Sequence, residues 1–173
     1  MITIFNNKSN LFLQNSYNNM IKLLPFHKLS CTCGRKGNLI KHAYYIRSVK
    51  VDGELVELKI LRILCKACKK THAILPDWLI PYSRTLFNDQ VKIIKTYLNK
   101  LWFEKIMVDN ILLDESNLKY VIKKFNEHWK ERLKTFSILL DDNLVFNCFK
   151  YFNRQFMQIK CTSNILFSTT HIT

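Results

Sequence analysis

The sequence predicts an α+β protein in which a small domain built on a β-hairpin precedes a three-helix domain of the helix-turn-helix type. Two close cysteine pairs enclose a stretch rich in β-forming residues, and apolar residues beyond position 83 recur at the three-and-four spacing of helices. Of the 173 residues 48% are hydrophobic, which excludes a wholly disordered chain and suits one ordinary domain or two small ones. The predicted segments are residues 1–30, 31–82, 83–140 and 141–173.

Residues 1–30 are predicted to form an N-terminal arm that contains one short helix. They are rich in Asn, Ser and Lys, with scattered apolar side chains. The polar run at residues 6–10 interrupts the apolar core that a secretory signal needs. No stretch approaches the roughly 18 uninterrupted apolar residues of a membrane span. We therefore expect a cytoplasmic protein without membrane contacts.

A β-hairpin is predicted over residues 39–64. Many β-formers lie on both sides of Asp52-Gly53, and this dipeptide favours a two-residue turn because both turn positions need a positive φ. The turn places Val51 opposite Glu54. The two strands then return the chain from the first cysteine pair to the second.

The four paired cysteines are a candidate site for one structural zinc ion. The hairpin brings together two pairs of thiolates, which Zn²⁺ binds in a tetrahedron. The predicted ligands are Cys31, Cys33, Cys65 and Cys68. In a reducing compartment close cysteine pairs are more typical of metal sites than of disulfides, although three disulfides among the six cysteines are the alternative. Four thiolates leave no open position on the metal, so we expect no catalysis there.

Details of the cysteine pattern leave some alternatives open. The first pair has one intervening residue where zinc ribbons usually have two, although Gly34 supplies the small residue that such a turn needs. If only one cysteine of that pair binds, a histidine can complete the site. The candidates are His27, His42 and His72. The isolated Cys148 and Cys161 are expected to be buried small apolar residues.

The charge of the chain favours a polyanionic partner. Its 27 Lys and Arg residues outnumber 13 Asp and Glu residues, and the excess is greatest over residues 31–82, with ten basic and four acidic residues. Such a surplus attracts nucleic acid but does not set specificity. Arg47 and Arg62 on the hairpin are therefore candidate nucleic-acid contacts.

Residues 71–82 are predicted to form a stiff connector. Pro76 and Pro81 restrict the residues before them to extended conformations. A domain boundary is expected near Ser83.

The first two of the three helices are predicted from apolar spacing. Asn88 or Asp89 can cap a helix whose apolar positions run from Val91 to Leu101. A second, shorter helix is expected around residues 102–107, which include two aromatic residues.

The third helix has the clearest pattern. It begins at the capping residues 114–117, and an apolar stripe lies opposite a lysine-bearing face. The stripe comprises Leu118, Val121, Ile122, Phe125, Trp129 and Leu133. Residues 141–173 show no clean period and are predicted to form a C-terminal tail.

A helix-turn-helix motif would place this third helix in the major groove of DNA. The candidate contacts in its first turns are Asn117, Lys119, Tyr120, Lys123 and Lys124. Asn can pair with adenine and Lys with guanine. The alternative is that these lysines form only the solvated face of a core helix.

Several strings of the sequence carry a resemblance to a known family. They are LSCTCG (29–34), LRILCKAC (61–68), THAILP (71–76), IPYS (80–83), DESN (114–117), HWKERL (128–133) and RQFMQIK (154–160). In these strings the chain resembles an uncharacterised bacterial family, domain-of-unknown-function family 6431. The resemblance implies a zinc ribbon followed by a helix-turn-helix, similar to the N-terminal DNA-binding regions of insertion-sequence transposases. It also implies that the short first cysteine pair is a family trait.

The function expected from these features is non-enzymatic binding of double-stranded DNA by a bacterial protein associated with a mobile element. It would act as a regulator or accessory factor, with a transposase as a possible partner. One alternative is a truncated transposase, although Asp141 and Asp142 are the only acids after the helices, and a usual transposase needs three carboxylates for its metal ions. Another is a zinc-ribbon adaptor that binds protein and no nucleic acid.

Overall fold

The computed structural model describes residues 1–5, 13–99, 114–160 and 164–168. The chain divides into two compact units. The sheet unit comprises Met1–Ser48, Glu57–Asp77 and Thr162–Thr173, and the helical unit comprises Val49–Val56 and Trp78–Cys161. None of the described helices has the length and apolar character that a membrane span requires.

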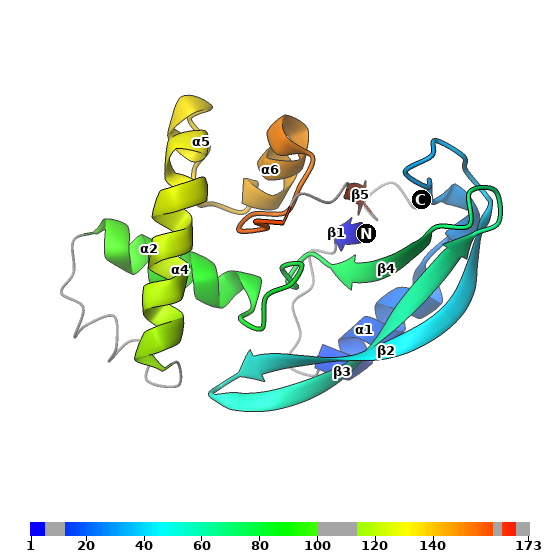
Figure 1. The fold of residues 1–173 in the computed structure, drawn as a ribbon, viewed down its shortest axis with the longest axis horizontal. Helices are drawn as coiled ribbons and strands as arrows, with labels where there is room; N and C mark the ends of the chain where they lie inside the picture. The colour runs from blue at the N-terminus through cyan, green and yellow to red at the C-terminus, as the bar shows by residue number, and fades with distance from the viewer. Residues whose placement is uncertain (6–12, 100–113, 161–163, 169–173) are drawn as a thin grey trace. The chain divides into compact units, whose positions relative to one another are not determined.

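A five-stranded mixed sheet has the strand order β2-β3-β4-β1-β5 (Figure 1). β3 and β4 are antiparallel, whereas β1 runs parallel to both β4 and β5. The strands are β1 (Ile2–Phe5), β2 (Leu39–Val51), β3 (Glu54–Cys65), β4 (Thr71–Pro76) and β5 (Ile165–Ser168). Together with the helices, this sheet confirms the predicted α+β class.

The predicted hairpin turn is confirmed. Asp52 and Gly53 join β2 to β3 with φ values of 49° and 84°, the left-handed region that a two-residue hairpin turn of type I′ uses. The tip of the hairpin belongs to the helical unit. There the Lys50 N–H donates to the Arg84 carbonyl at 2.8 Å, and the Lys50 ammonium pairs with Asp114.

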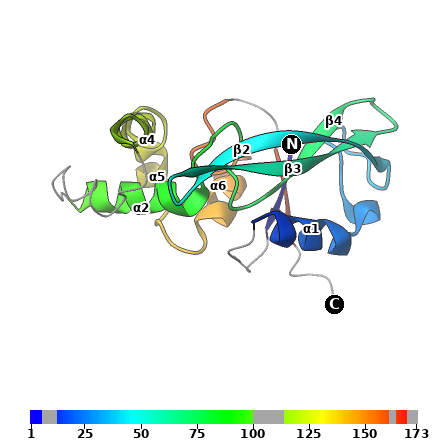
Figure 2. The same cartoon turned by 90° about the horizontal axis from the view of Figure 1, so that it is seen from below.

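The described part of residues 1–30 does not form an arm, because it belongs to the sheet unit. Ile2 and Ile4 of β1 are fully buried. Helix α1 (Leu13–Leu23) lies along β2 and β3 against one side of the sheet (Figures 1 and 2). The Tyr17 hydroxyl accepts a hydrogen bond from the Leu61 N–H at 2.8 Å and donates to the Ile74 carbonyl at 3.1 Å, so it joins β3 to β4.

The predicted connector is a strand for half of its length. β4 is extended, as the prolines suggested, but it lies between β3 and β1 and its residues Ile74 and Leu75 are fully buried. In this part of the chain, the boundary between the two units falls between Asp77 and Trp78. This differs from the expected boundary near Ser83.

The helical unit contains α2 (Phe87–Leu98), α4 (Glu115–His128), α5 (Lys130–Thr135) and α6 (Leu144–Phe152) among its described residues. The predicted cap of α2 is wrong. The helix begins before Asn88, its N-cap is Leu86, and no side chain caps it. The Trp78 carbonyl instead accepts from the Phe87 N–H at 3.0 Å, so backbone from a preceding segment satisfies this end of the helix.

The capping residue predicted for the third helix is confirmed in α4, where the Asp114 carboxylate accepts from the Asn117 N–H at 2.8 Å. The apolar stripe is also buried as predicted, with Ile122 half-buried. The helix itself does not continue through the stripe. It is interrupted at Trp129, which has a φ of −121° and lies between the end of α4 and the start of α5.

Aromatic rings dominate the core of the helical unit. Trp129 packs edge-to-face against Phe156 and Phe152, with ring centroids 5.3 and 5.6 Å away. Phe152 lies in α6, a helix within the segment predicted to be a tail, and Cys148 of α6 is fully buried, as predicted. The second predicted helix and Cys161 lie outside the described residues.

Candidate metal centre

Four sulfur atoms converge in the sheet unit. The Sγ atoms of Cys31, Cys33, Cys65 and Cys68 all lie within 4.8 Å of one another. Cys31 Sγ is 3.5 Å from Cys68 Sγ, and Cys33 Sγ is 3.9 Å from Cys65 Sγ. All four thiols are free. The sequence-predicted ligand set is thus brought together, and it can hold a metal ion.

The first cysteine pair lies in a tight turn before β2. The Gly34 N–H donates to the Cys31 carbonyl at 2.9 Å, and the Cys31 N–H donates to the Arg35 carbonyl at 3.0 Å. Gly34 has a φ of +84°, a conformation that glycine adopts without strain. This turn directs both thiols to one point although a single residue separates them.

The second pair lies in the turn from β3 to β4. The Lys69 N–H donates to the Cys65 carbonyl and the Cys65 N–H donates to the Lys70 carbonyl, both at 2.9 Å. Lys69 has a φ of +60°, which reverses the chain after Cys68. The Lys66 N–H also donates to the Asn38 carbonyl at 2.8 Å, so this turn is tied to the residue that precedes β2.

Backbone amides lower the pKa of one of the four thiols. The N–H groups of Cys68 and Ala67 donate to the Cys65 sulfur and lower the pKa of this thiol to about 7. A thiolate, not a thiol, is the metal ligand. Burial has the opposite effect on Cys31, where it raises the pKa to about 12. A bound cation would favour deprotonation of both.

His72 is the histidine that the structure brings to the cluster. Its Nε2 atom lies 3.1 Å from Cys31 Sγ, and its side chain is buried on β4. Burial, followed by the positive charges of the N-terminus and Lys70, lowers its pKa and keeps the ring neutral. The other two candidate histidines, His27 and His42, are exposed and are not part of the cluster.

Exposed cations surround the two cysteine turns. They are Arg35, Lys36, Lys66, Lys69 and Lys70. None of these five side chains makes an ion pair within the part of the chain that the structure describes. Their charges therefore remain available to an external anion.

The comparisons with known proteins concern this region. A family described as a domain of unknown function (DUF6431) matches residues 30–117. The chain belongs to this family. The matched region contains all four cysteines and His72, the whole of β2, β3 and β4, and the first residues of α4. No curated protein and no solved structure matches the chain.

In this family member, four of the five nucleic-acid contacts predicted on α4 interact with acids of their own helix or its cap. Lys119 pairs with Glu115, and Lys123 and Lys124 pair with Glu127 at 3.7 and 2.8 Å. The Asn117 side-chain amide donates to Asp114. Tyr120 is 56% exposed, and the Lys124 ammonium lies 5.9 Å from its ring centroid. These residues share one helix, but most of their charge is balanced.

The two hairpin arginines differ in exposure. Arg62 on β3 is exposed, and its guanidinium lies 5.3 Å from the centroid of the Tyr45 ring. Arg47 on β2 is half-buried, and this burial lowers the pKa of its guanidinium. Arg62 is therefore the more accessible of the two.

Proposed function

We propose that this protein binds double-stranded DNA through its sheet unit, and that the four cysteines hold one structural zinc ion. The proposal retains the zinc ribbon expected from the sequence. In the proposal, the ribbon is the end of the β2–β3 hairpin that carries the cysteines, and this hairpin is part of a larger sheet. The proposal moves the main DNA contact from the third helix to the cations around the cysteine turns.

The spacing of the sulfur atoms supports zinc. Four thiolates bound at about 2.3 Å to the corners of a tetrahedron lie about 3.8 Å apart. The two sulfur pairs at 3.5 and 3.9 Å bracket this value. Zn²⁺ prefers tetrahedral thiolate sites. With all four positions filled by protein, such an ion would have a structural role.

The distribution of charge is the observation that carries the DNA-binding proposal. The sheet unit contains 12 Lys and Arg residues but only two acids, Glu57 and Asp77. The helical unit contains 15 Lys and Arg residues and 11 acids. Net charges of +10 and +4 follow, so most of the charge that attracts a polyanion belongs to the sheet unit.

Ion pairs increase this difference between the two units in the positive charge available to a polyanion. The cations beside the cysteines make no ion pairs within the described residues, whereas Lys119, Lys123 and Lys124 on α4 each face a glutamate. A lysine that leaves an acidic partner to bind phosphate gains less than one that starts unpaired. A role in transposition, as regulator or accessory factor, is a further part of the proposal and rests only on the resemblance of the sequence.

Zinc content and DNA affinity test the two parts of the proposal separately. We expect one zinc ion per chain by elemental analysis of protein purified without added metal. We also expect binding to mixed-sequence duplex DNA that weakens steeply with salt, because each neutralised phosphate adds roughly 0.9 to the log-log slope.

The outcomes are distinct. A chain free of zinc, or a different metal in stoichiometric amount, would contradict the zinc assignment. Absence of duplex binding at low salt would contradict DNA binding, and capture of protein partners by such a chain would favour the adaptor function. A matched assay with single-stranded DNA and with duplex RNA identifies the preferred nucleic acid.

A further inference from the structure

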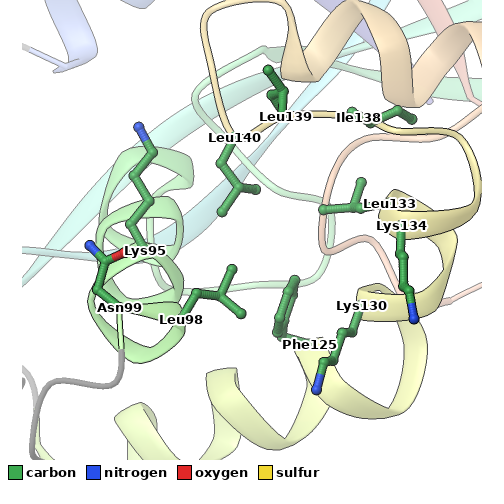
Figure 3. Close-up of a pocket in the computed structure, with 10 residues that line it drawn as sticks. All are labelled: Lys95, Leu98, Asn99, Phe125, Lys130, Leu133, Lys134, Ile138, Leu139 and Leu140. Atoms are coloured by element: carbon green, nitrogen blue, oxygen red, sulfur yellow. The ribbon is translucent and has the colours of Figure 1, made fainter.

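An apolar groove lies in the helical unit between α2, α4, α5 and the segment after α5. Its volume is about 550 Å³, within the range of ligand-binding pockets. Its apolar lining consists of Leu98, Phe125, Leu133, Ile138, Leu139 and Leu140 (Figure 3). We call this feature the apolar groove.

Two leucines of the groove are unusually exposed. Leu139 is 69% exposed and Leu98 is 44% exposed, whereas Phe125 and Leu133 beneath them are buried. Exposed leucines that adjoin a buried apolar floor form a continuous surface that a partner can cover. Covering these side chains would remove apolar area from water and so favour binding.

Three lysines border the apolar groove, and no acid is among the lining residues that the structure describes. Lys95 of α2 lies on one side, and Lys130 and Lys134 of α5 lie on the other (Figure 3). All three are exposed and make no ion pair within the described part of the chain. They differ in this from the lysines of α4, which have glutamate partners.

We propose that the apolar groove binds an acidic amphipathic helix of a partner protein. Such a helix presents leucine-like side chains along one stripe and carboxylates beside it, which matches an apolar floor with lysines on both sides. This proposal is independent of the zinc and DNA assignments.

The chemistry of the groove disfavours two other occupants. A DNA backbone has no apolar side to cover Leu139 and Leu98, so it would leave the exposed leucines in water. A fatty acid has one carboxylate, which cannot serve lysines on opposite sides of the groove. Several carboxylates spaced along a peptide can form ion pairs with all three lysines.

A designed peptide tests the proposal on the full-length protein. The probe is a short fluorescein-labelled helix with leucines at a spacing of three and four and glutamates elsewhere, and its binding is followed by fluorescence anisotropy. We expect the double substitution Lys130→Glu and Lys134→Glu to weaken binding about tenfold, because two attractive pairs become repulsive. Leu139→Asp should weaken it comparably, and we expect this variant to fold because Leu139 is 69% exposed.

Matched controls test whether the loss of peptide affinity arises at the apolar groove. Lys150→Glu changes the charge of an exposed lysine on α6 outside the groove and should leave peptide affinity within twofold. A peptide with lysines in place of glutamates should not bind. Carbodiimide, which couples carboxylates to adjacent amines, should join the peptide to Lys95, Lys130 or Lys134, as read by mass spectrometry.

Several results would overturn the proposal. They are absence of peptide binding at low salt, equal weakening by Lys150→Glu, and cross-links confined to other lysines. Dodecanoate binding in place of the peptide would assign the groove to a small carboxylate. Displacement of the peptide by duplex DNA, with equal loss of DNA affinity in the Lys130/Lys134 variant, would assign it to nucleic acid.

Discussion

The sheet unit and the helical unit use a basic composition in different ways. In the sheet unit, cations that make no ion pair among the described residues surround a cluster of thiols, and acids are almost absent. In the helical unit, most lysines of α4 face glutamates, and a cluster of aromatic rings fills the core. Both units therefore have a net positive charge, but their basic side chains differ in whether they have acidic partners. The lysines of α4 have glutamate partners, whereas the cations beside the thiols have no ion-pair partner among the described residues.

The two units also differ in what stabilises them. The helical unit has the large buried side chains Trp129, Phe125 and Phe156, which supply the apolar area of an ordinary core. The sheet unit buries mainly aliphatic residues, and the residues between and directly after its paired cysteines are exposed. They are Thr32, Gly34, Lys66, Ala67 and Lys69. A metal ion is the interaction that would hold those turns together. We therefore expect loss of the metal to destabilise the sheet unit and loss of core aromatic side chains to destabilise the helical unit.

The largest expected effect is the loss of the metal from the sheet unit. Cys65→Ser with Cys68→Ser should abolish zinc binding and remove hydrogen-exchange protection from β3 and β4, because structural zinc contributes about 10 to 16 kcal/mol of binding energy in small zinc-finger peptides. Protection in α4 and α6 should persist. Cys148→Ala is the matched control and should keep the metal. Equal loss of protection in both units would show that they are not separate.

A core substitution should affect the helical unit selectively. We expect Trp129→Ala to cost about 3 to 5 kcal/mol, the usual range for deleting a fully buried large aromatic side chain, with zinc content unchanged. Denaturant unfolding followed by helical circular dichroism measures it. Trp129→Phe should cost less, because the indole N–H has no hydrogen-bond partner among the described residues. A loss of zinc in Trp129→Ala would argue against two independently stabilised units.

A smaller effect distinguishes the two candidate DNA surfaces. Replacing Arg35, Lys66 and Lys70 by Gln should lower the log-log salt slope of duplex binding by roughly 0.9 for each lost phosphate contact. Lys119→Gln with Lys123→Gln should change the slope little, because those lysines have glutamate partners. Fluorescence anisotropy at several salt concentrations gives both slopes. The reverse order would return the DNA contact to the third helix.

The smallest effect is a pH dependence at the start of α4. The Lys50 ammonium, followed by the Ser116 hydroxyl and the Asn117 N–H, holds the pKa of Asp114 well below its ordinary value of 3.8. A lowered pKa in the folded state stabilises the protein above that ordinary value, and this contribution declines as the pH falls below it.

Asp114→Asn is the matched variant, since it keeps the capping oxygen and loses the charge. We expect the wild type to be more stable than this variant at neutral pH, and the difference to shrink toward about pH 2. Denaturant midpoints at the two pH values measure it. A difference that is independent of pH would mean that the ion pair with Lys50 contributes nothing.

The features predicted correctly from the sequence depend on neighbours in the chain. Asp52-Gly53 determines its own turn, and Asp114 caps a helix that begins at the next residue. The cysteine cluster could also be predicted, because one hairpin is enough to bring its two halves together. In each case the interacting groups lie within one element or one hairpin.

The features that were missed depend on distant partners. β1, β4 and β5 are short apolar segments that become strands only through pairing, as with Ile2 beside both Ile74 and Ile165. The start of α2 depends on the Trp78 carbonyl. A local signal for α6 was present in the spacing of Leu144, Val145, Cys148 and Phe149, with Asn153 in a left-handed conformation after the helix.

The pairing of β1 with β5 has a consequence for how the protein is made. During synthesis the first strand leaves the ribosome long before its parallel partner, and the whole helical unit is translated between them. Because domains tend to fold as they emerge, the helical unit can be complete while one edge of the sheet is still open. The nascent chain must therefore hold β1 against β4 and keep that edge from pairing with other chains until Ile165–Ser168 arrives.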